Sequence, residues 1–369
     1  MARAIELAKA GSGWVNPNPQ VGAVIVKDGV IVGEGYHAKC GDLHAERNAF
    51  KNLKGDCHGG TIYVTLEPCC HYGKQPPCTE AIVEHGIAKV VIGSRDPNPL
   101  VAGKGVAFLK EHGIEVVEDF MRDECDELNA IFFHYITTGK PYVSMKYAMT
   151  MDGKIATFTG ASKWITGDEA RTHVHKIRSR YSAIMAGIGT VEADDPMLNA
   201  RGENENYHQP LRVIVDSKLS IPEESAIVKS ATEYKTVIAC TDGADKEKRQ
   251  CLEAKGINVI ICNDENSSHV DLRKVISWLG ENKYDSLLIE GGGQIHESAL
   301  KSGIVNHAYA YIAPKIFGGD KAKTPVEGEG IDVPAKAAVF ELRDTKVLGK
   351  DILLEYDIKE GMDDVYWNC

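Results

Sequence analysis

The sequence lacks a hydrophobic run approaching the ~20 residues that a membrane-spanning helix needs. Its first residues, Met1–Ala8, also lack the apolar core and cleavage site of a signal peptide and instead favour the start of an amphipathic helix. We therefore expect a cytoplasmic protein. Ten cysteines in 369 residues without a secretory signal favour free thiols and a metal site over a disulfide framework.

Positive charge is also scarce, because 42 Lys and Arg face 53 Asp and Glu, for a net charge of −11. Residues 1–139 hold 13 basic and 18 acidic side chains, and residues 140–369 hold 29 and 35. Neither part offers the basic surface that binding to a nucleic-acid backbone requires. A small-molecule substrate is favoured, and the length favours two domains.

Three potential metal ligands, His44, Cys69 and Cys78, occur within the first eighty residues. Three is the number that a catalytic zinc uses when its fourth position is left open for water. Each residue alone is more often structural, but together with Glu46 they give the H-x-E…P-C…C pattern of zinc-dependent base deaminases. Residues i and i+2 diverge by ~200° around a helix, so His44 and Glu46 can share a site only at a helix's first turn.

The predicted chemistry follows from these residue types. Cysteines at a strand-to-helix passage lie near backbone N–H groups and a positive helix end, which favour the thiolate that zinc needs. Zinc lowers the pKa of its water toward ~7. Glu46 would take that proton, pass it to a ring nitrogen and help ammonia leave.

The spacing of the two cysteines narrows the choice of deaminase. Nucleoside and nucleic-acid deaminases usually have P-C-x-x-C, whereas here eight residues separate Cys69 from Cys78. The stretch Thr65–Cys78, together with Asn16–Pro19, Gly35–His37 and Asp96–Pro99, resembles the deaminase half of the bifunctional riboflavin-biosynthesis deaminase/reductase family. The similarity continues past residue 140 and covers nearly the whole chain. Cys70 departs from the family pattern, in which we expect serine.

This resemblance implies a cytidine-deaminase-like three-layer domain at residues 1–139. It also implies that the substrate's ring and sugar phosphate contact Asn18, His37, Lys74 and Asn98. Three of these four residues also have a structural alternative. Asn18 and Asn98 each lie between prolines and could simply form turns, and Lys74 could be a solvated loop residue.

Alternating helix and strand patterns predict an α/β fold in the first part. We expect an opening helix, helices over 44–53, 79–85 and 123–138, and strands over 21–26, 30–33, 61–66, 89–93 and 113–117. Asp28-Gly29 is a hairpin signal between the first two strands. The run Thr138–Pro141 contains a glycine and a proline, so we place the domain boundary there.

The second part predicts a mostly parallel α/β sheet followed by β-rich sequence. We expect strands over 142–147, 182–187, 211–216, 236–240, 258–262, 286–290, 308–313 and 351–356. Two glycine-rich turns follow strands, at Gly187–Thr190 and at Glu290–Gly293. Neither is the G-x-G-x-x-G fingerprint. With Asp216-Ser217 at a third strand end, they favour a dinucleotide across the carboxyl ends of the strands.

The same resemblance implies that residues 140–369 form an NADPH-dependent reductase domain similar in fold to dihydrofolate reductase. It implies NADPH contacts at Ala148, Trp164, Thr190, Asp194, Ser217, Gly292, Gly293, Gln294, Ile295, His296, Glu297 and Ser298. The ribosylamino phosphate would contact Ser162, Arg178, Leu198, Arg201 and Glu290. Arginine suits phosphate because it can bind it bidentately, although a lone arginine is more often a surface charge.

The most concrete hypothesis is a two-domain enzyme with one zinc per chain and bound NADPH. It would deaminate 2,5-diamino-6-ribosylamino-4(3H)-pyrimidinone 5′-phosphate and then reduce the ribosyl group to ribityl. We expect a homo-oligomer of unspecified size. Two alternatives stay open: another nucleoside or nucleic-acid deaminase with an unrelated second domain, and a non-catalytic protein whose structural zinc takes Cys70 or His71 as fourth ligand.

Overall fold

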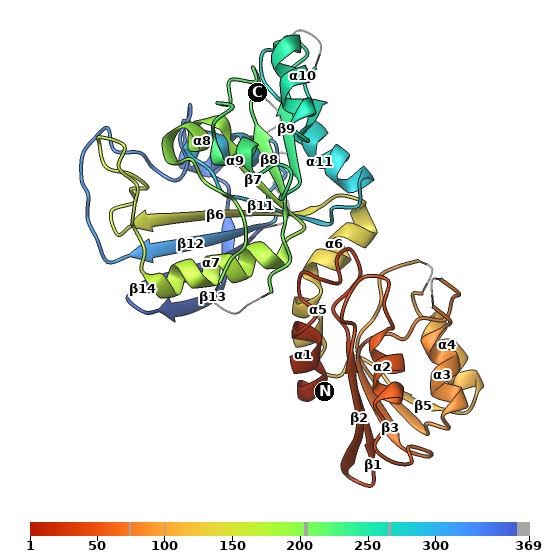
Figure 1. Ribbon diagram of the computed structural model, residues 1–369. Helices are drawn as coiled ribbons and strands as arrows, with labels where there is room; N and C mark the ends of the chain where they lie inside the picture. The colour runs from red at the N-terminus through yellow and green to blue at the C-terminus, as the bar shows by residue number, and fades with distance from the viewer. Residues whose placement is uncertain (74, 100, 203–205, 265–266, 360–369) are drawn as a thin grey trace. The chain divides into compact units, whose positions relative to one another are not determined.

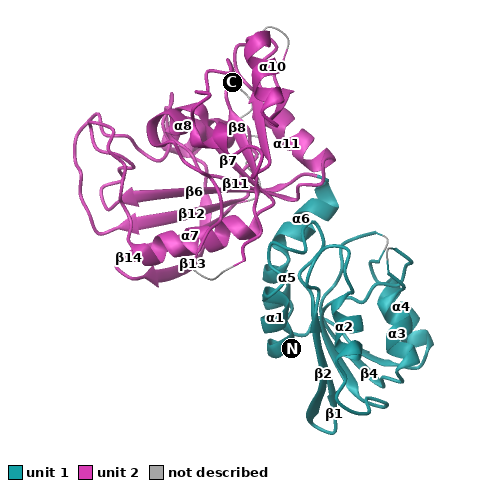
Figure 2. Cartoon of the chain, in the orientation of Figure 1, with its two compact units in different colours: residues 1–139 teal, residues 140–369 magenta. Residues whose placement is uncertain are grey.

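The computed structural model describes residues 1–73, 75–99, 101–202, 206–264 and 267–359. The chain divides into two compact units, residues 1–139 and residues 140–369 (Figure 2). No helix in the described ranges is long and apolar enough to cross a bilayer.

Unit 1 is built on a five-stranded sheet with the order β2-β1-β3-β4-β5 (Figure 1). The strands are β1 (Gly22–Lys27), β2 (Val30–Tyr36), β3 (Thr61–Leu66), β4 (Lys89–Ser94) and β5 (Glu115–Val117). β1 pairs antiparallel with β2 and β3, whereas β3, β4 and β5 run parallel. The predicted hairpin is confirmed: Asp28 and Gly29 both have positive φ, of 51° and 78°, as its two-residue turn requires.

Helices cover both faces of this sheet, giving three layers. They are α1 (Ala2–Lys9), α2 (Ala45–Lys51), α3 (Cys78–Glu84), α4 (Lys104–Glu111), α5 (Arg122–Leu128) and α6 (Ala130–Thr138). Glycines let two helices approach the strands: a Cβ on Gly22 would meet the Ala4 carbonyl of α1 at 1.9 Å, and one on Gly35 would meet the Ala49 nitrogen of α2 at 2.3 Å. The main core lies between the sheet and α2, α3 and α4.

The single helix expected over 123–138 is wrong, because the segment forms two helices that meet at Asn129. The buried Asn129 side chain accepts a hydrogen bond from the Gln20 backbone N–H at 2.8 Å and donates to the Gln20 carbonyl at 3.0 Å. Its backbone, with φ −117° and ψ 19°, is no longer helical. A tertiary contact therefore overrides an otherwise helical pattern.

Unit 2 contains a nine-stranded sheet with the order β10-β9-β8-β7-β11-β6-β12-β14-β13. The strands are β6 (Tyr142–Thr150), β7 (Ala183–Gly187), β8 (Leu211–Val215), β9 (Thr236–Cys240), β10 (Asn258–Ile261), β11 (Ser286–Ile289), β12 (His307–Ala313), β13 (Phe340–Leu348) and β14 (Asp351–Ile358). The strands from β10 to β12 are parallel, and β14 and β13 add antiparallel pairs. The mostly parallel sheet is confirmed.

Two hydrophobic cores cover the faces of this sheet. One packs under α11 (Leu272–Glu281) and α12 (Gly293–Lys301). The other packs under α8 (Ile188–Asp194), α9 (Ala226–Lys229) and α10 (Lys246–Ala254), and α7 (Asp168–Arg180) also covers part of the sheet (Figure 1). Because the central strands are parallel, their carboxyl ends meet at one edge, and the glycine-rich turns lie there.

Candidate active sites

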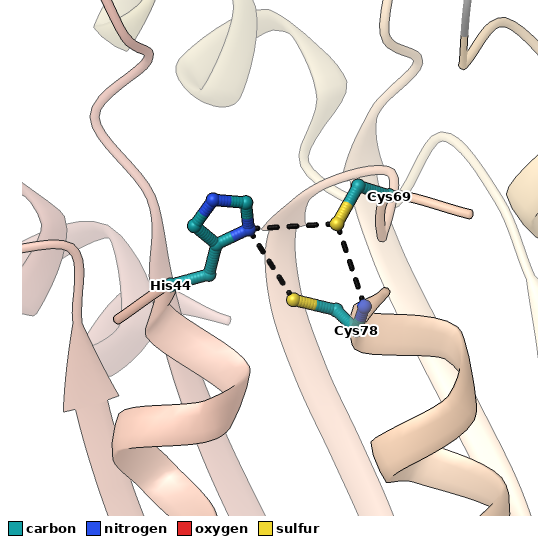
Figure 3. Close-up of side chains that lie close together, drawn as sticks. All are labelled: His44, Cys69 and Cys78. Atoms are coloured by element: carbon teal, nitrogen blue, oxygen red, sulfur yellow. Dashed lines mark hydrogen bonds between the residues drawn. The ribbon is translucent and has the colours of Figure 1, made fainter. Parts of the chain in front are cut away.

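Three side chains from separate elements of unit 1 converge on one point (Figure 3). His44 is the N-cap of α2, Cys69 follows β3, and Cys78 is the first residue of α3. Both sulfurs lie 3.4 Å from His44 Nδ1. The potential ligand atoms all lie within 4.8 Å of one another.

These distances fit a tetrahedral zinc site. With Zn–S of about 2.3 Å and Zn–N of about 2.0 Å, tetrahedral geometry requires S···N separations of about 3.5 Å. The Cys78 side chain lowers the pKa of the Cys69 thiol to about 4 against the opposing effect of burial, and His44 adds to this effect. That contact and burial raise the pKa of Cys78, so of the two thiols Cys69 is the one that favours the thiolate form a metal ligand needs.

No fourth His, Cys, Asp or Glu joins this cluster among the residues that the structure describes. Cys70 lies next to Cys69 in sequence, but burial raises the pKa of its thiol. A three-ligand set leaves a position for water, as catalytic zinc sites do. This arrangement favours a catalytic centre over a closed structural one.

Glu46 occupies the first turn of α2, two residues after His44. This is the one place on a helix where residues i and i+2 can share a site. Its side chain is only 4% exposed, and burial raises the pKa of its carboxyl group, with the nearby Cys69 adding to the effect. A carboxyl group whose pKa is raised takes up a proton more readily and can release it again, as a general acid–base group must. It is the candidate proton carrier of the site.

His44, Glu46 and Cys69 line one cavity of about 390 Å³. The three other sequence-predicted residues that can be placed, Asn18, His37 and Asn98, line the same cavity. Lys74 lies outside the described residues. The structure thus brings together residues from five separate motifs.

Hydrogen bonds fix the ring of His37. Its Nδ1 lies 3.0 Å from the Leu43 carbonyl, which can only accept, so Nδ1 carries the proton. Its Nε2 then accepts from Asn18 Nδ2 at 3.1 Å. Burial lowers the pKa of His37, which keeps the ring neutral.

Sequence reasoning missed Asp96 as a cavity residue. Asp96 is 8% exposed, lines the cavity, and accepts a hydrogen bond from the Asn98 backbone N–H at 2.8 Å. Burial raises the pKa of its carboxyl group to about 6. The Asp-x-Asn spacing, which is typical of a side chain that bonds the backbone two residues on, was the available signal.

A buried ion cluster occupies the carboxyl edge of the unit 2 sheet. Arg178 of α7 donates to both oxygens of Glu290 at 2.7 and 2.8 Å, and Lys146 Nζ lies 3.5 Å from Glu290 Oε2. Burial alone would raise the pKa of Glu290, but Arg178 and Lys146 lower it to about 2. The cluster therefore holds one carboxylate between two cations.

Beside this cluster, Asn199 connects two arginines. Its backbone carbonyl accepts from Arg178 Nη1 at 3.1 Å, and its side-chain oxygen accepts from Arg201 Nη1 at 2.8 Å. Leu198 precedes it with φ 47° and is 3% exposed. Of the predicted substrate contacts in unit 2, Arg178, Leu198, Arg201 and Glu290 thus lie in one connected group.

The two glycine-rich turns meet at the start of two helices. Gly292 is the N-cap of α12, and its backbone N–H donates to Thr190 Oγ1 in the first turn of α8 at 3.1 Å. A Cβ on Gly293 would meet Glu327 Cγ at 2.4 Å, so glycine permits close packing there. The hydrogen bond thus joins the two turns directly.

The remaining predicted cofactor contacts differ in accessibility. Trp164 is 61% exposed and stacks on Arg171, whose guanidinium lies 4.6 Å from its ring centre. Ser162 donates to Asp194 at 2.7 Å. The others lie on β6, after β8 or along α12: Ala148, Ser217, Gln294, Ile295, His296, Glu297 and Ser298. Ile295 and His296 are 8% and 0% exposed, so their side chains belong to the interior.

Comparison with known proteins matches both units. Residues 1–94 match the cytidine and deoxycytidylate deaminase zinc-binding region, and residues 141–354 match the RibD C-terminal domain. The riboflavin biosynthesis protein RibD of Actinobacillus pleuropneumoniae is 55% identical over 356 residues, covering 96% of this chain and 94% of that protein. The Bacillus amyloliquefaciens protein of the same name is 42% identical, covering 100% and 98%.

Solved structures agree over the full length. Acinetobacter baumannii RibD, form 1, superposes with a TM-score of 0.86 at 37% identity, covering 97% of this chain and 98% of that one. A Thermotoga maritima diaminohydroxyphosphoribosylaminopyrimidine deaminase/5-amino-6-(5-phosphoribosylamino)uracil reductase gives 0.84 at 37% identity, covering 97% of each chain. The predicted family and two-part fold are confirmed, and the chain belongs to the RibD family of bifunctional deaminase/reductase enzymes of riboflavin biosynthesis.

Proposed function

We propose that unit 1 removes an amino group from 2,5-diamino-6-ribosylamino-4(3H)-pyrimidinone 5′-phosphate by hydrolysis. Unit 2 then reduces the ribosyl chain with NADPH to give 5-amino-6-ribitylamino-2,4-pyrimidinedione 5′-phosphate. The observation that carries the first step is the ligand cluster of His44, Cys69 and Cys78, two of which, His44 and Cys69, line one cavity with the buried Glu46. The name of the Thermotoga maritima relative, which pairs a deaminase of the diamino compound with a reductase of the uracil compound, supports the same order of reactions.

In this proposal His44, Cys69 and Cys78 hold zinc, which when bound activates a water molecule for attack on the ring. Glu46 takes the proton from that water, delivers it to the ring nitrogen, and assists the departure of ammonia. Its raised pKa matches a group that must both accept and donate. His37, Asn18 and Asn98 contact the ring and its sugar phosphate, with His37 held in one tautomer.

The chain should carry one zinc. Cys69→Ser should lose the metal because serine does not supply a thiolate, whereas Cys70→Ser should retain it because Cys70 lies outside the ligand cluster. Elemental analysis of the purified protein and both variants measures this. Two zinc ions per chain, or an active deaminase without any, would refute the ligand assignment.

The second half of the proposal places NADPH across the carboxyl ends of β7, β8 and β11. Adjacent parallel strands bring the starts of α8 and α12 together, and the hydrogen bond between Gly292 and Thr190 fixes their spacing. Free N–H groups at a helix start favour the phosphates of a dinucleotide. Ala148, Trp164, Asp194 and Ser217 extend the same binding surface.

We assign the ribosyl phosphate of the substrate to the group around Arg178, Glu290 and Arg201. Glu290 neutralises one charge of the Arg178–Lys146 pair, whereas Arg201 donates only to neutral acceptors among its described contacts. A guanidinium without a carboxylate partner suits a phosphate. Ser162 and Leu198 complete the proposed contacts.

Residues 140–369 alone should bind NADPH. The fragment keeps one complete nine-stranded sheet with both of its cores. Fluorescence titration of the purified fragment and the full chain should give dissociation constants that agree within a few fold. A folded fragment without NADPH affinity would show that the cofactor site needs residues of unit 1.

We also infer that the chain forms a homo-oligomer. The hairpin β13–β14 at the sheet edge exposes Leu342, Val347 and Ile352 by 59%, 74% and 43%, and Val347 pairs directly with Ile352. An exposed apolar patch on an edge strand favours contact with another protein surface. We propose that this other surface belongs to a second copy of the chain.

A further inference from the structure

The segment Asp195–Arg201 has a backbone conformation that its own residue types disfavour. Asp195 and Leu198 both have left-handed φ, of 41° and 47°, which is costly for side chains with a Cβ. Yet Leu198, Asn199 and Ala200 are 3%, 6% and 3% exposed. Contacts from outside the segment must therefore hold it in place.

One of these contacts comes from Gln209, which is itself solvent-exposed. Its side-chain Oε1 accepts a hydrogen bond from the Ala200 N–H at 3.1 Å, and its Nε2 donates to the Ala200 carbonyl at 2.7 Å. The amide thus pairs with both backbone groups of one residue, as a neighbouring strand would. Ala200 is the residue directly between Asn199 and Arg201.

A second contact comes from Arg212, three residues after Gln209 and fully buried in β8. Its Nη1 donates to the Met197 carbonyl at 3.2 Å, and its other described hydrogen bonds also go to neutral oxygens, such as Thr236 Oγ1 at 2.7 Å. A buried guanidinium that bonds only neutral groups acts as a multiple donor for backbone and hydroxyl oxygens. Arg212 thus holds the backbone at Met197, and Gln209 holds it three residues later at Ala200.

We propose that Gln209 and Arg212 are positioning residues that fix the Met197–Ala200 backbone, so that Arg201 is presented to the substrate phosphate. The proposal rests on the phosphate assignment of Arg201 made above. Arg201 donates to Asn199 Oδ1 and Arg178 donates to the Asn199 carbonyl, so the fixed backbone also sets the distance between the two guanidinium groups. Displacement of Ala200 would therefore weaken phosphate binding while the Arg178–Glu290 pair stays intact.

Gln209→Met tests this proposal, because methionine keeps the length of the side chain and loses both hydrogen bonds to Ala200, together with the one to the Tyr207 carbonyl. Since Gln209 is exposed, the variant should fold normally. Reductase KM for the deaminated ribosylamino phosphate, and Ki for ribose 5-phosphate, should each rise about three- to tenfold, the scale of lost hydrogen bonds. The kcat, the NADPH dissociation constant and deamination should stay within twofold, and Gln250→Met, on an exposed position of α10, should change nothing.

A double-variant cycle with Arg201→Ala separates the positioning role of Gln209 from the phosphate contact of Arg201. Without the guanidinium, Gln209→Met should raise KM no further, because the residue acts through Arg201. Multiplying effects, or an unchanged KM in Gln209→Met when Arg201→Ala raises it, would overturn the positioning role alone. An unchanged KM in Arg201→Ala would overturn the phosphate assignment, and the positioning role with it.

Discussion

Glu46→Gln should lower kcat for deamination by ~10²–10⁴-fold, the usual contribution of a positioned general acid–base group. Glutamine keeps the shape of the side chain but cannot accept a proton from water. Glu46 lines the same cavity as His44 and Cys69 but does not belong to the ligand cluster, so zinc content should not change. Release of ammonia under saturating substrate, with elemental analysis of the same sample, measures both quantities.

The matched control for this variant is Glu111→Gln, on the exposed end of α4, which should deaminate normally. NADPH-dependent reduction should also be unaffected in Glu46→Gln when the deaminated compound is supplied. A loss of only a few fold would show that another group carries the proton, and Asp96 would be the next candidate because it lines the same cavity.

Arg178→Met should destabilise unit 2 by about 3–5 kcal/mol, because it leaves Glu290 buried without its bidentate partner. The loss is large because Glu290 is 8% exposed and Lys146 alone lies at the longer distance of 3.5 Å. Reductase activity should fall with it, and deamination should persist. Urea unfolding of the 140–369 fragment measures the free energy, and Arg249→Met, which breaks the exposed pair with Glu253, should cost less than about 1 kcal/mol.

The same ion cluster predicts how stability depends on pH. Because the folded-state pKa of Glu290 is about 2 against an ordinary 4.5, its contribution is fully present above pH 4.5 and is lost as pH falls toward 2. The native 140–369 fragment should therefore lose about 3 kcal/mol more than Arg178→Met over this range. Equal pH slopes for the two proteins would contradict the pairing.

Most strands and the convergence of the candidate metal ligands could be predicted from sequence because their signals are local. Alternating or continuous apolar runs gave most strands, and the ligand pattern with the cap argument placed His44 and Glu46 at the start of α2. Strand β13 was missed because it is an edge strand whose residues are almost all exposed or partly exposed, so it carries no apolar pattern. Helix α4 was also not anticipated.

Features that depend on distant contacts could not be predicted in this way. The break at Asn129 depends on Gln20, more than a hundred residues earlier. The pairing of Gln209 with Ala200 and the depth of Asp96 in the cavity likewise appear only once the chain is folded. No local pattern distinguishes Asn129 or Gln209 from ordinary surface positions, and the Asp-x-Asn spacing indicates a turn at Asp96 but not its burial.

The most direct test of the two-site account is to incubate the full chain with 2,5-diamino-6-ribosylamino-4(3H)-pyrimidinone 5′-phosphate, with and without NADPH, and to identify the products by mass. Without NADPH the account predicts a product in which one amino group is replaced by oxygen. With NADPH it predicts that this product gains a hydride and a proton. Failure to deaminate without NADPH, or reduction of the ribosyl chain before deamination, would contradict it.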